Sequence, residues 1–466
     1  MQRRSFLKAT AGAGLASAPS LANAQAKQPN VVLILFDDLS WRDFSSYGHD
    51  YHRTPNIDAL AKEGMRFTNA YAACPVCSPT RSSVMTGKYP VRTGVTDWIP
   101  GRAQWPTAKL LTPRTTLQMK LEEVTLAERM KQAGYATAAI GKWHLGGEGF
   151  GPTEQGFDYN VGGNHRGSNP YFGPFQLPGL ENRTKQDYLT DELMKAARAW
   201  VDTQVGGRKP FFLFSPNYSV HTPIQAPEDR IPQTPGKTAL QRTYQAMLEI
   251  TDQHIGRLRE QLKQSGEYEN TIWIVTSDNG GLRYEGKNPV PHTVNAPLRA
   301  GKGHLYEGGI RVPLIVAGPG VKRGESNALV ASVDIMPTVL SLTGQAAQTG
   351  IDGVDVLRPV KRPALYWHYP HYSNQGGVPG GAMREGNWKL IEFYEDSRLE
   401  LFNLAEDPGE TKNLAKREAK RAAAMREKLE QWRKASGAIL PTANPGYKAG
   451  GDDQGLAGTE QPTPAL

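Results

Sequence analysis

Short runs of apolar residues alternate with longer amphipathic segments over the first three quarters of the chain. The run at 31–36, VVLILF, is apolar at every position, which is typical of a strand covered on both faces of a parallel sheet. Further strands are predicted at 136–140, 211–215, 271–276 and 312–317, and helices at 55–63, 124–132, 188–201 and about 240–262. This alternation predicts an α/β fold with a large, mainly parallel sheet flanked by helices.

The pattern changes after a glycine-rich connector at 350–353. Beyond it, short strands are predicted at 365–369, 381–385, 388–394 and 399–403, followed by a helix at 416–434. We therefore expect a main domain over 28–348 and a smaller C-terminal α+β domain over 349–440, with an antiparallel sheet and one helix. Residues 441–466 contain few apolar side chains, which predicts a disordered tail.

The length of 466 residues is sufficient for a large buried core. No apolar run reaches the ~18 residues that a membrane-spanning helix needs, so we expect no membrane anchoring. The formal net charge is +8, and removal of a leader with three basic residues would leave +5. Such a modest excess is compatible with anionic substrates but does not predict a nucleic-acid partner.

The first 24 residues have the order of segments found in an export signal. Arg3 and Arg4 form a twin-arginine pattern, a mildly apolar segment follows at 9–21, and Ala22-Asn23-Ala24 is a small-x-small cleavage site. We therefore expect a twin-arginine signal peptide at 1–24 and an exported protein, either periplasmic or secreted.

Carboxylates follow two of the predicted strands. Asp37 and Asp38 come directly after the first strand, and Asp278 and Asn279 come after the strand at 271–276. Repulsion between neighbouring carboxylates must be relieved by a cation, by protonation or by solvent. An Asp-rich turn would explain one pair alone, whereas two such groups favour a metal site. Oxygen donors suit Ca²⁺ or Mg²⁺ better than Zn²⁺.

Basic side chains follow two further strands. In an extended segment Lys142 and His144 point to the same side, which places an ammonium and an imidazole in one pocket suited to a tetrahedral anion. His221 lies shortly after the strand at 211–215. Taken alone, a Lys-x-His pair or a single histidine is more often an ordinary surface or structural feature.

The only two cysteines, Cys74 and Cys77, lie in the stretch ACPVCSPTRSSVMTG at 73–87. One explanation is a small buried thiol, since free cysteine packs like a modest hydrophobe. Another is a redox pair with C-x-x-C spacing, although no thioredoxin-like unit follows. The third explanation is that Cys77 is the precursor of a nucleophile.

The third explanation rests on a resemblance to a known family. The positions that carry it are Cys77, Pro79, Arg81, Thr86 and Gly87, together with GKWHLG at 141–146. They resemble the signature of the type I, arylsulfatase-like sulfatases, in which a separate enzyme oxidises the cysteine to Cα-formylglycine. Thr80 replaces the usual serine and keeps a hydroxyl group. The resemblance implies the fold of the alkaline-phosphatase-like superfamily.

The resemblance also implies roles for individual residues. The implied metal ligands are Asp37, Asp38, Asp278, Asn279 and the formylglycine made from Cys77. The implied ion is Ca²⁺, although the residues alone leave Mg²⁺ open. Lys142 would hold sulfate and formylglycine oxygens, His144 would transfer the proton at the formylglycine hydroxyl, and His221 would contact sulfate or protonate the leaving oxygen. Lys302 resembles the second active-site lysine of the family and would bind sulfate.

A hydrated aldehyde would explain why a cysteine is modified for this chemistry. One hydroxyl attacks sulfur and the other later expels sulfate as the carbonyl forms again, so one difficult step becomes two. Arg81, four residues after Cys77 at a predicted helix start, would hold the hydrated aldehyde. The cation and the two lysines would neutralise charge on the sulfate oxygens.

The sequence therefore predicts an exported sulfuric ester hydrolase that acts on a sulfated small molecule or polysaccharide, with a sulfated carbohydrate favoured. Its transient partner would be a formylglycine-generating enzyme. Cys74 would be a packing residue. The alternatives are a phosphonate or phosphodiester hydrolase on the same fold, and a non-catalytic anion-binding or redox protein with unmodified Cys77.

Overall fold

The structure is a computed structural model that describes residues 27–104, 107–207, 209–233, 236–282, 293–358 and 362–447. The predicted leader at 1–24 and the greater part of the predicted tail, 448–466, lie outside the described residues. No helix in the described ranges is long and apolar enough to cross a membrane.

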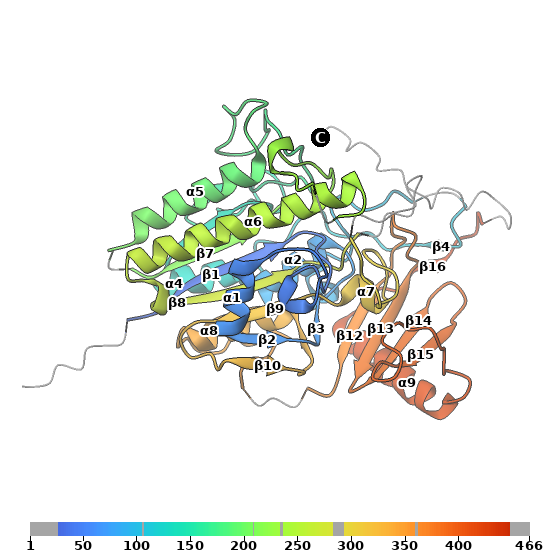
Figure 1. Cartoon of the computed structure of the whole chain (residues 1–466). Coiled ribbons are helices and arrows are strands. Elements are labelled where there is room, and N and C mark those ends of the chain that lie inside the picture. Colours follow the sequence, from blue (N-terminus) through green and yellow to red (C-terminus); the bar gives the residue numbers. More distant parts are fainter. Residues whose placement is uncertain are drawn as a thin grey trace, which may run out of the picture.

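A sheet of eight strands forms the centre of the larger part of the molecule (Figure 1). In spatial order the strands are β10 (Gly324–Ser326), β2 (Met65–Phe67), β9 (Leu314–Ala317), β8 (Thr271–Ser277), β1 (Asn30–Phe36), β7 (Phe211–Pro216), β5 (Ala136–Ile140) and β6 (Tyr159–Val161). The pairings are parallel except those of β9 with β8 and with β2. The predicted mainly parallel sheet is confirmed.

Helices cover both faces of this sheet, which explains why β1 is apolar at every position after Asn30. The helices on one face are α1 (Pro55–Glu63), α5 (Leu189–Gln204) and α6 (Ala239–Gln264), and those on the other are α2 (Cys77–Thr86), α4 (Leu126–Gln132) and α8 (Ile335–Leu342). Val32, Ile34 and Phe36 pack with the first group, and Val31, Leu33 and Leu35 with the second. Successive side chains of a strand point to opposite faces, so both cores use the same strand.

A smaller antiparallel sheet lies beside the large one (Figure 1). Its strands are β12 (Leu365–Tyr369), β13 (Gly380–Glu385), β14 (Trp388–Phe393) and β15 (Leu399–Asn403), and helix α9 (Ala419–Ser436) covers one face. The other face packs against residues that surround the two cysteines, including Ala73, Val76 and Cys74 itself. The predicted small sheet with one helix is confirmed, and Cys74 is a packing residue of this interface.

The remaining elements are short. They are β3 (Ala70–Tyr71), β4 (Leu110–Leu111), β11 (Val330–Ala331), β16 (Thr442–Ala443), α3 (Pro90–Thr93), α7 (Glu307–Ile310) and the 3₁₀ helices η1 (Ser45–Tyr47), η2 (Glu228–Arg230), η3 (Tyr268–Asn270) and η4 (Ser332–Asp334).

The start of the predicted disordered tail, 441–466, is ordered in the described part of the chain. The expected disordered segment begins at 441, yet Thr442 and Ala443 form β16, which pairs antiparallel with β4. The segment contains few apolar residues, and its order comes instead from backbone hydrogen bonds to a strand more than three hundred residues earlier in the chain. Such a partner has no local signature in the sequence.

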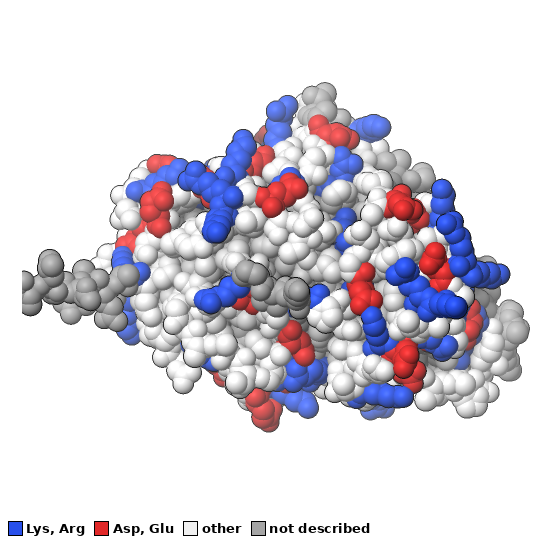
Figure 2. Space-filling view, turned by 90° about the horizontal axis from the view of Figure 1, so that it is seen from below, with Lys and Arg blue, Asp and Glu red and all other residues white. Residues whose placement is uncertain are grey.

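Charged side chains of both signs are interspersed on the face of the molecule shown in Figure 2. The net positive charge is therefore not gathered into one basic patch on that face.

Candidate active site

Five elements of the large sheet direct polar residues to one edge. β1, β5, β7 and β8 are parallel, so their carboxyl ends meet there. β9 runs the opposite way, so the segment that precedes it reaches the same edge. The structure brings together at this edge all the residues predicted for the site, namely Asp37, Asp38, Cys77, Arg81, Lys142, His144, His221, Asp278, Asn279 and Lys302.

Four oxygen-bearing side chains form the deepest part of the site. The register of β1 and β8 aligns Phe36 with Ser277, so the residues that follow each strand lie side by side. Asp37, Asp38, Asp278 and Asn279 are at most 1% exposed. The backbone N–H of Asp38 donates to Asp278 Oδ1 at 3.2 Å, and the amide nitrogen of Asn279 donates to Asp38 Oδ1 at 2.8 Å.

These donors fit a hard divalent cation. Within the described residues, Asp37 Oδ1 and Asn279 Oδ1 are buried and accept no hydrogen bond. A buried polar atom without a partner costs about 1–3 kcal/mol, and a cation would satisfy both oxygens. Burial and the nearby Asp278 raise the pKa of Asp37, so a positive ion here would also favour the ionised carboxylate.

Three cations surround the carboxylates. Lys142 Nζ lies 2.6 Å from Asp37 Oδ2, and Lys302 Nζ lies 2.8 Å from Asp38 Oδ2. Arg81 donates through Nε to Asp278 Oδ2 at 2.8 Å. Three carboxylates thus balance three cations, so a bound divalent ion would leave the site positive and suited to an anion.

Cys77 is the first residue of α2 and is 3% exposed. Pro79 can occupy the first turn because the first N–H groups of a helix have no partner within the helix. Arg81 follows one turn later on the same side, which directs its guanidinium toward Asp278. Burial raises the pKa of the Cys77 thiol, although Lys142 and Lys302 oppose the shift. The unmodified thiol is therefore a weak nucleophile at neutral pH.

His144 faces residue 77 with a defined ring nitrogen. Its Nε2 lies 2.6 Å from the carbonyl oxygen of Ile99, which can only accept, so Nε2 carries a proton. Burial, with the neighbouring charge of Lys142, holds the pKa of His144 well below its usual value, so the ring is neutral. The lone pair of Nδ1 therefore points at Cys77 Sγ, 3.4 Å away.

The backbone conformation of Gly141 and its close contact with β7 determine the position of Lys142. Gly141 has φ 134°, and a Cβ atom there would lie 1.9 Å from the carbonyl oxygen of Pro216 at the end of β7. The same carbonyl accepts a hydrogen bond from the N–H of Lys142 at 2.7 Å. His221, from the loop after β7, places Nε2 3.6 Å from Asp38 Oδ2.

Comparison with known proteins identifies the family. The family model for sulfatases matches residues 29–345, about two thirds of the chain. The chain belongs to the sulfatase family. A second model, for the C-terminal part of N-sulphoglucosamine sulphohydrolase, matches residues 300–435. The resemblance predicted from the motifs is confirmed, and the protein is a sulfuric ester hydrolase.

Individual relatives extend over most of this sulfatase. A sulfatase of Formosa agariphila is 30% identical, with 86% of this chain and 88% of the relative covered. The N-acetylgalactosamine-6-sulfatase of Canis lupus familiaris is 32% identical, with 77% and 70% covered. The solved structure of Ps i-CgsB in complex with k-i-k-neocarrahexaose is 28% identical with a TM-score of 0.76, and covers 90% of this chain and 94% of that one.

Sequence reasoning missed the main-chain and pocket residues of the sulfatase site. The carbonyl of Ile99 sets the tautomer of His144, yet a backbone carbonyl has no sequence signature. Next to Ile99, Asp97, Arg102 and His371 help to line a small pocket. Tyr369 OH, from the small sheet, donates to Asp97 Oδ1 at 2.9 Å. The pocket therefore joins a loop of the main part to the C-terminal part of the chain.

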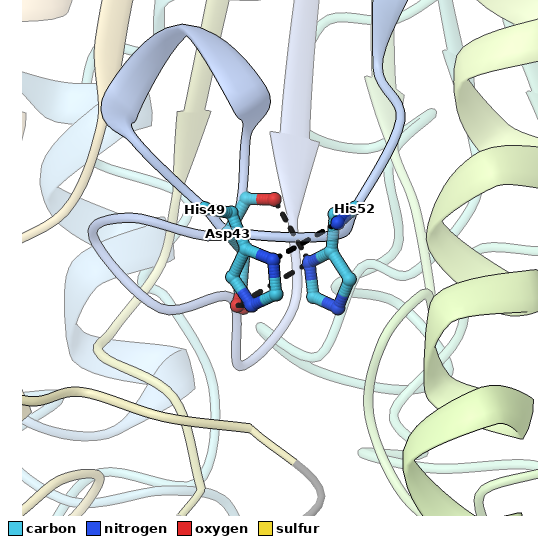
Figure 3. A group of neighbouring side chains, drawn as sticks. All are labelled: Asp43, His49 and His52. Carbon is cyan, nitrogen blue, oxygen red and sulfur yellow. Dashed lines mark hydrogen bonds and ion pairs between the residues drawn. The ribbon is translucent and has the colours of Figure 1, made fainter. Parts of the chain in front are cut away.

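A second group of potential metal ligands lies in the loop after β1 (Figure 3). The rings of His49 and His52 are stacked 3.4 Å apart at 7°. The lone pairs of a ring lie in its plane, so two stacked rings cannot both point at one ion. In addition, His49 Nδ1 accepts the N–H groups of Tyr51 and His52, and His52 Nδ1 lies 2.9 Å from the carbonyl oxygen of Asp43. This arrangement orders the loop and does not fit a metal.

Proposed function

We propose that this sulfatase is exported and removes sulfate from a sulfated carbohydrate, using a Cα-formylglycine at position 77 and a divalent cation, with Ca²⁺ favoured over Mg²⁺. The arrangement around residue 77 supports the proposal. A neutral imidazole nitrogen faces this residue at 3.4 Å, and the buried unpartnered oxygens of Asp37 and Asn279 belong to the same group of side chains. The thiol itself is buried and its pKa is raised, which argues against direct catalysis by cysteine.

The side chains around residue 77 have distinct tasks in the proposed reaction. Hydrated formylglycine supplies one hydroxyl for attack on sulfur and another for release of sulfate, while the cation supplies positive charge at the sulfate oxygens. Lys142 and Lys302 add two further charges at the non-bridging oxygens, and Arg81 holds residue 77 from one helical turn away.

Two histidines would transfer the protons of the proposed reaction. His144 accepts a proton at Nδ1, because the carbonyl of Ile99 keeps Nε2 protonated. His221 keeps its Nδ1 proton on the carbonyl oxygen of Thr222, 2.7 Å away, so it would donate to the leaving oxygen through Nε2 only in its doubly protonated form, which Asp38, 3.6 Å from Nε2, would favour. The two rings would therefore act on different protons of one reaction.

Two observations support a carbohydrate substrate. The N-acetylgalactosamine-6-sulfatase is named for a sulfated sugar, and Ps i-CgsB was solved with k-i-k-neocarrahexaose. The pocket beside Ile99 also offers polar groups from Asp97, Arg102 and His371, which suit hydroxyl and sulfate groups. The pocket itself has room for about one water molecule, so we assign the contact with the alcohol part of the substrate to Arg102 rather than to the pocket.

Mass spectrometry and matched assays test the proposal. The protein is produced with and without a formylglycine-generating enzyme, and the peptide that contains residue 77 is analysed for conversion of the thiol to an aldehyde. Hydrolysis of a sulfate ester should rise with the converted fraction, and Cys77→Ala should be inactive. Activity of a fully unconverted protein would contradict the role of formylglycine, and a large preference for a matched phosphonate ester would contradict the assigned reaction.

Substrate and export are tested separately. A panel of defined sulfated oligosaccharides should contain a substrate with higher kcat/KM than a small aryl sulfate, and Arg102→Met should lower that kcat/KM while leaving the kcat/KM for the aryl sulfate almost unaffected.

For export, replacement of Arg3 and Arg4 by lysine should retain the protein in the cytoplasm, whereas the unaltered chain should be recovered outside it without residues 1–24. We also propose the domain boundary near 348, at the connector between the two sheets.

A further inference from the structure

A group of buried charges joins the C-terminal sheet to the main part of the sulfatase. Glu307, Lys389 and Glu410 are each fully buried. Lys389 Nζ on β14 lies 3.0 Å from Glu307 Oε1 and 2.9 Å from Glu410 Oε1. Tyr71 OH donates to Glu307 Oε2 at 2.8 Å, and Arg311 Nε lies 3.1 Å from the same oxygen. The chemistry proposed above uses none of these groups.

The group is attached to the backbone of α7. Glu410 Oε2 accepts a hydrogen bond from the N–H of Glu307, the first residue of α7, at 2.6 Å. Lys389 then holds both carboxylates through its two ion pairs. Two residues of the C-terminal part therefore determine where α7 begins.

α7 in turn is hydrogen bonded to the two segments that carry Asn279 and Lys302. The N–H of Gly280, which follows Asn279, donates to the carbonyl oxygen of Gly309 in α7 at 2.9 Å. On the other side, the N–H of Gly308 donates to the carbonyl oxygen of Arg299 at 2.9 Å, just before Lys302. The N–H of Lys302 donates to the carbonyl oxygen of Gly281 at 3.1 Å, so these two segments are also bonded directly to each other.

These contacts leave no free space between the segments. A Cβ atom at Gly308 would lie 2.4 Å from the carbonyl oxygens of Arg299 and Ala300, and one at Gly280 would lie 1.9 Å from the carbonyl oxygen of Gly308. Closely packed backbone moves as a unit. A displacement of α7 would therefore displace Lys302 and the turn that carries Asn279.

We propose that Lys389 and Glu410 are positioning residues of the sulfatase: through Glu307 they hold α7, and thereby Lys302 and Asn279, in the geometry that binds the sulfate group. The inference rests on the roles proposed for Lys302 and Asn279. It explains why an ion pair is buried here, since buried ion pairs contribute little net stability. The C-terminal part thus completes the site without touching the sulfate.

The test compares two lysine-to-methionine changes in the C-terminal part. Lys389→Met removes the buried charge, and Lys428→Met is the matched control because Lys428 forms an exposed ion pair with Glu385 on the same sheet. Glu410→Gln is a second test variant, since it keeps the shape and an acceptor for the N–H of Glu307. All proteins are measured with a small aryl sulfate at a temperature far below their unfolding midpoints.

Lys389→Met and Glu410→Gln should lower kcat/KM about 10- to 100-fold, as expected for a shift of catalytic groups by a fraction of an ångström to 1 Å. They should also weaken binding of inorganic sulfate, measured by calorimetry, while Lys428→Met leaves both quantities unchanged. Lys389→Arg should restore part of the activity. A merely structural role would lower the unfolding midpoint without changing sulfate affinity in the folded protein.

Wild-type kcat/KM and sulfate affinity in either folded test variant would overturn the inference. Failure of both variants to fold would also overturn it, because the group would then be a structural support alone. An unaltered protein that binds inorganic sulfate but hydrolyses no sulfate ester would instead overturn the proposed function. The binding measurement therefore separates the two failures.

Discussion

Replacement of Asn279 by leucine should reduce both the stability of the protein and its response to a divalent cation. Asn279 donates hydrogen bonds from its amide nitrogen to Asp38 Oδ1 at 2.8 Å and to the carbonyl oxygen of Gly280 at 3.0 Å. Loss of these bonds costs about 2–4 kcal/mol in the free energy of unfolding, with or without an ion. The buried Oδ1, which has no hydrogen-bond partner among the described residues, adds a second effect only when a cation uses it.

The loss of stabilisation by the cation can be estimated from the coupling between ligand binding and folding. A ligand at a hundred times its dissociation constant stabilises the native state by about 2.7 kcal/mol, and each tenfold loss of affinity removes about 1.4 kcal/mol of this. If removal of one oxygen ligand weakens cation binding at least tenfold, Asn279→Leu should lose half or more of the stabilisation by Ca²⁺. The difference should be visible as a smaller rise in unfolding midpoint.

Thermal unfolding in Ca²⁺, in Mg²⁺ and in EDTA measures this difference. Asn30→Leu is the matched control, because Asn30 is also buried and hydrogen bonded but begins β1 at the end away from the site. This control should lower the midpoint by the same amount in all three solutions. An equal rise with Ca²⁺ in wild type and Asn279→Leu would refute the assignment of Asn279 as a ligand, and no rise in either would refute the cation site.

Three further predictions follow from individual contacts. His144→Ala should lower kcat about 10²- to 10⁴-fold in steady-state kinetics far below its unfolding midpoint, because the ring faces residue 77 and is the base that we propose; an unchanged kcat would contradict this role. Cys77→Ala should abolish turnover yet keep affinity for inorganic sulfate within a few-fold by calorimetry, since the cationic groups remain, and loss of binding would show that residue 77 holds the anion. Burial raises the pKa of Asp191, but hydrogen bonds from His254 and Arg230 outweigh it and lower the pKa to about 2. The ionised form is thus favoured by folding, and its stabilising effect is present above the unfolded pKa of about 3.9 and lost as the pH falls toward 2. Asp191→Asn should therefore cost about 2 kcal/mol in urea unfolding at pH 7 and progressively less below pH 4, and a constant cost across this range would contradict the assignment.

The regular elements were predictable where burial gives a local pattern. β1 is buried on both faces and is therefore apolar throughout, and each strand of the small sheet was found within a residue at either end. β9 was expected from 312 but begins at Leu314, after Pro313, which lacks an N–H for the ladder. The pairing of Thr442 with Leu111 had no local pattern, because strand pairing at this place depends on a distant backbone.

The site was predictable as a set of chemical groups but not as an arrangement. The proposed metal ligands follow strands and Cys77 lies in a motif at a helix start, so Asp37, Asp278 and Cys77 were visible in the sequence. Their convergence follows from the parallel order of the strands. The direction in which each group points does not, since it depends on contacts between loops.

The sequence by itself determined which residues can react. It specified Cys77 within its motif, the oxygen donors after two strands, and the lysines and histidines that suit an anion. Only the tertiary structure decided that the Ile99 carbonyl sets the tautomer of His144 and that Lys389 and Glu410 hold the start of α7. The physical reason is that both effects arise from packing of the main chain between segments remote in sequence, and such contacts leave no pattern in the residues of either segment alone.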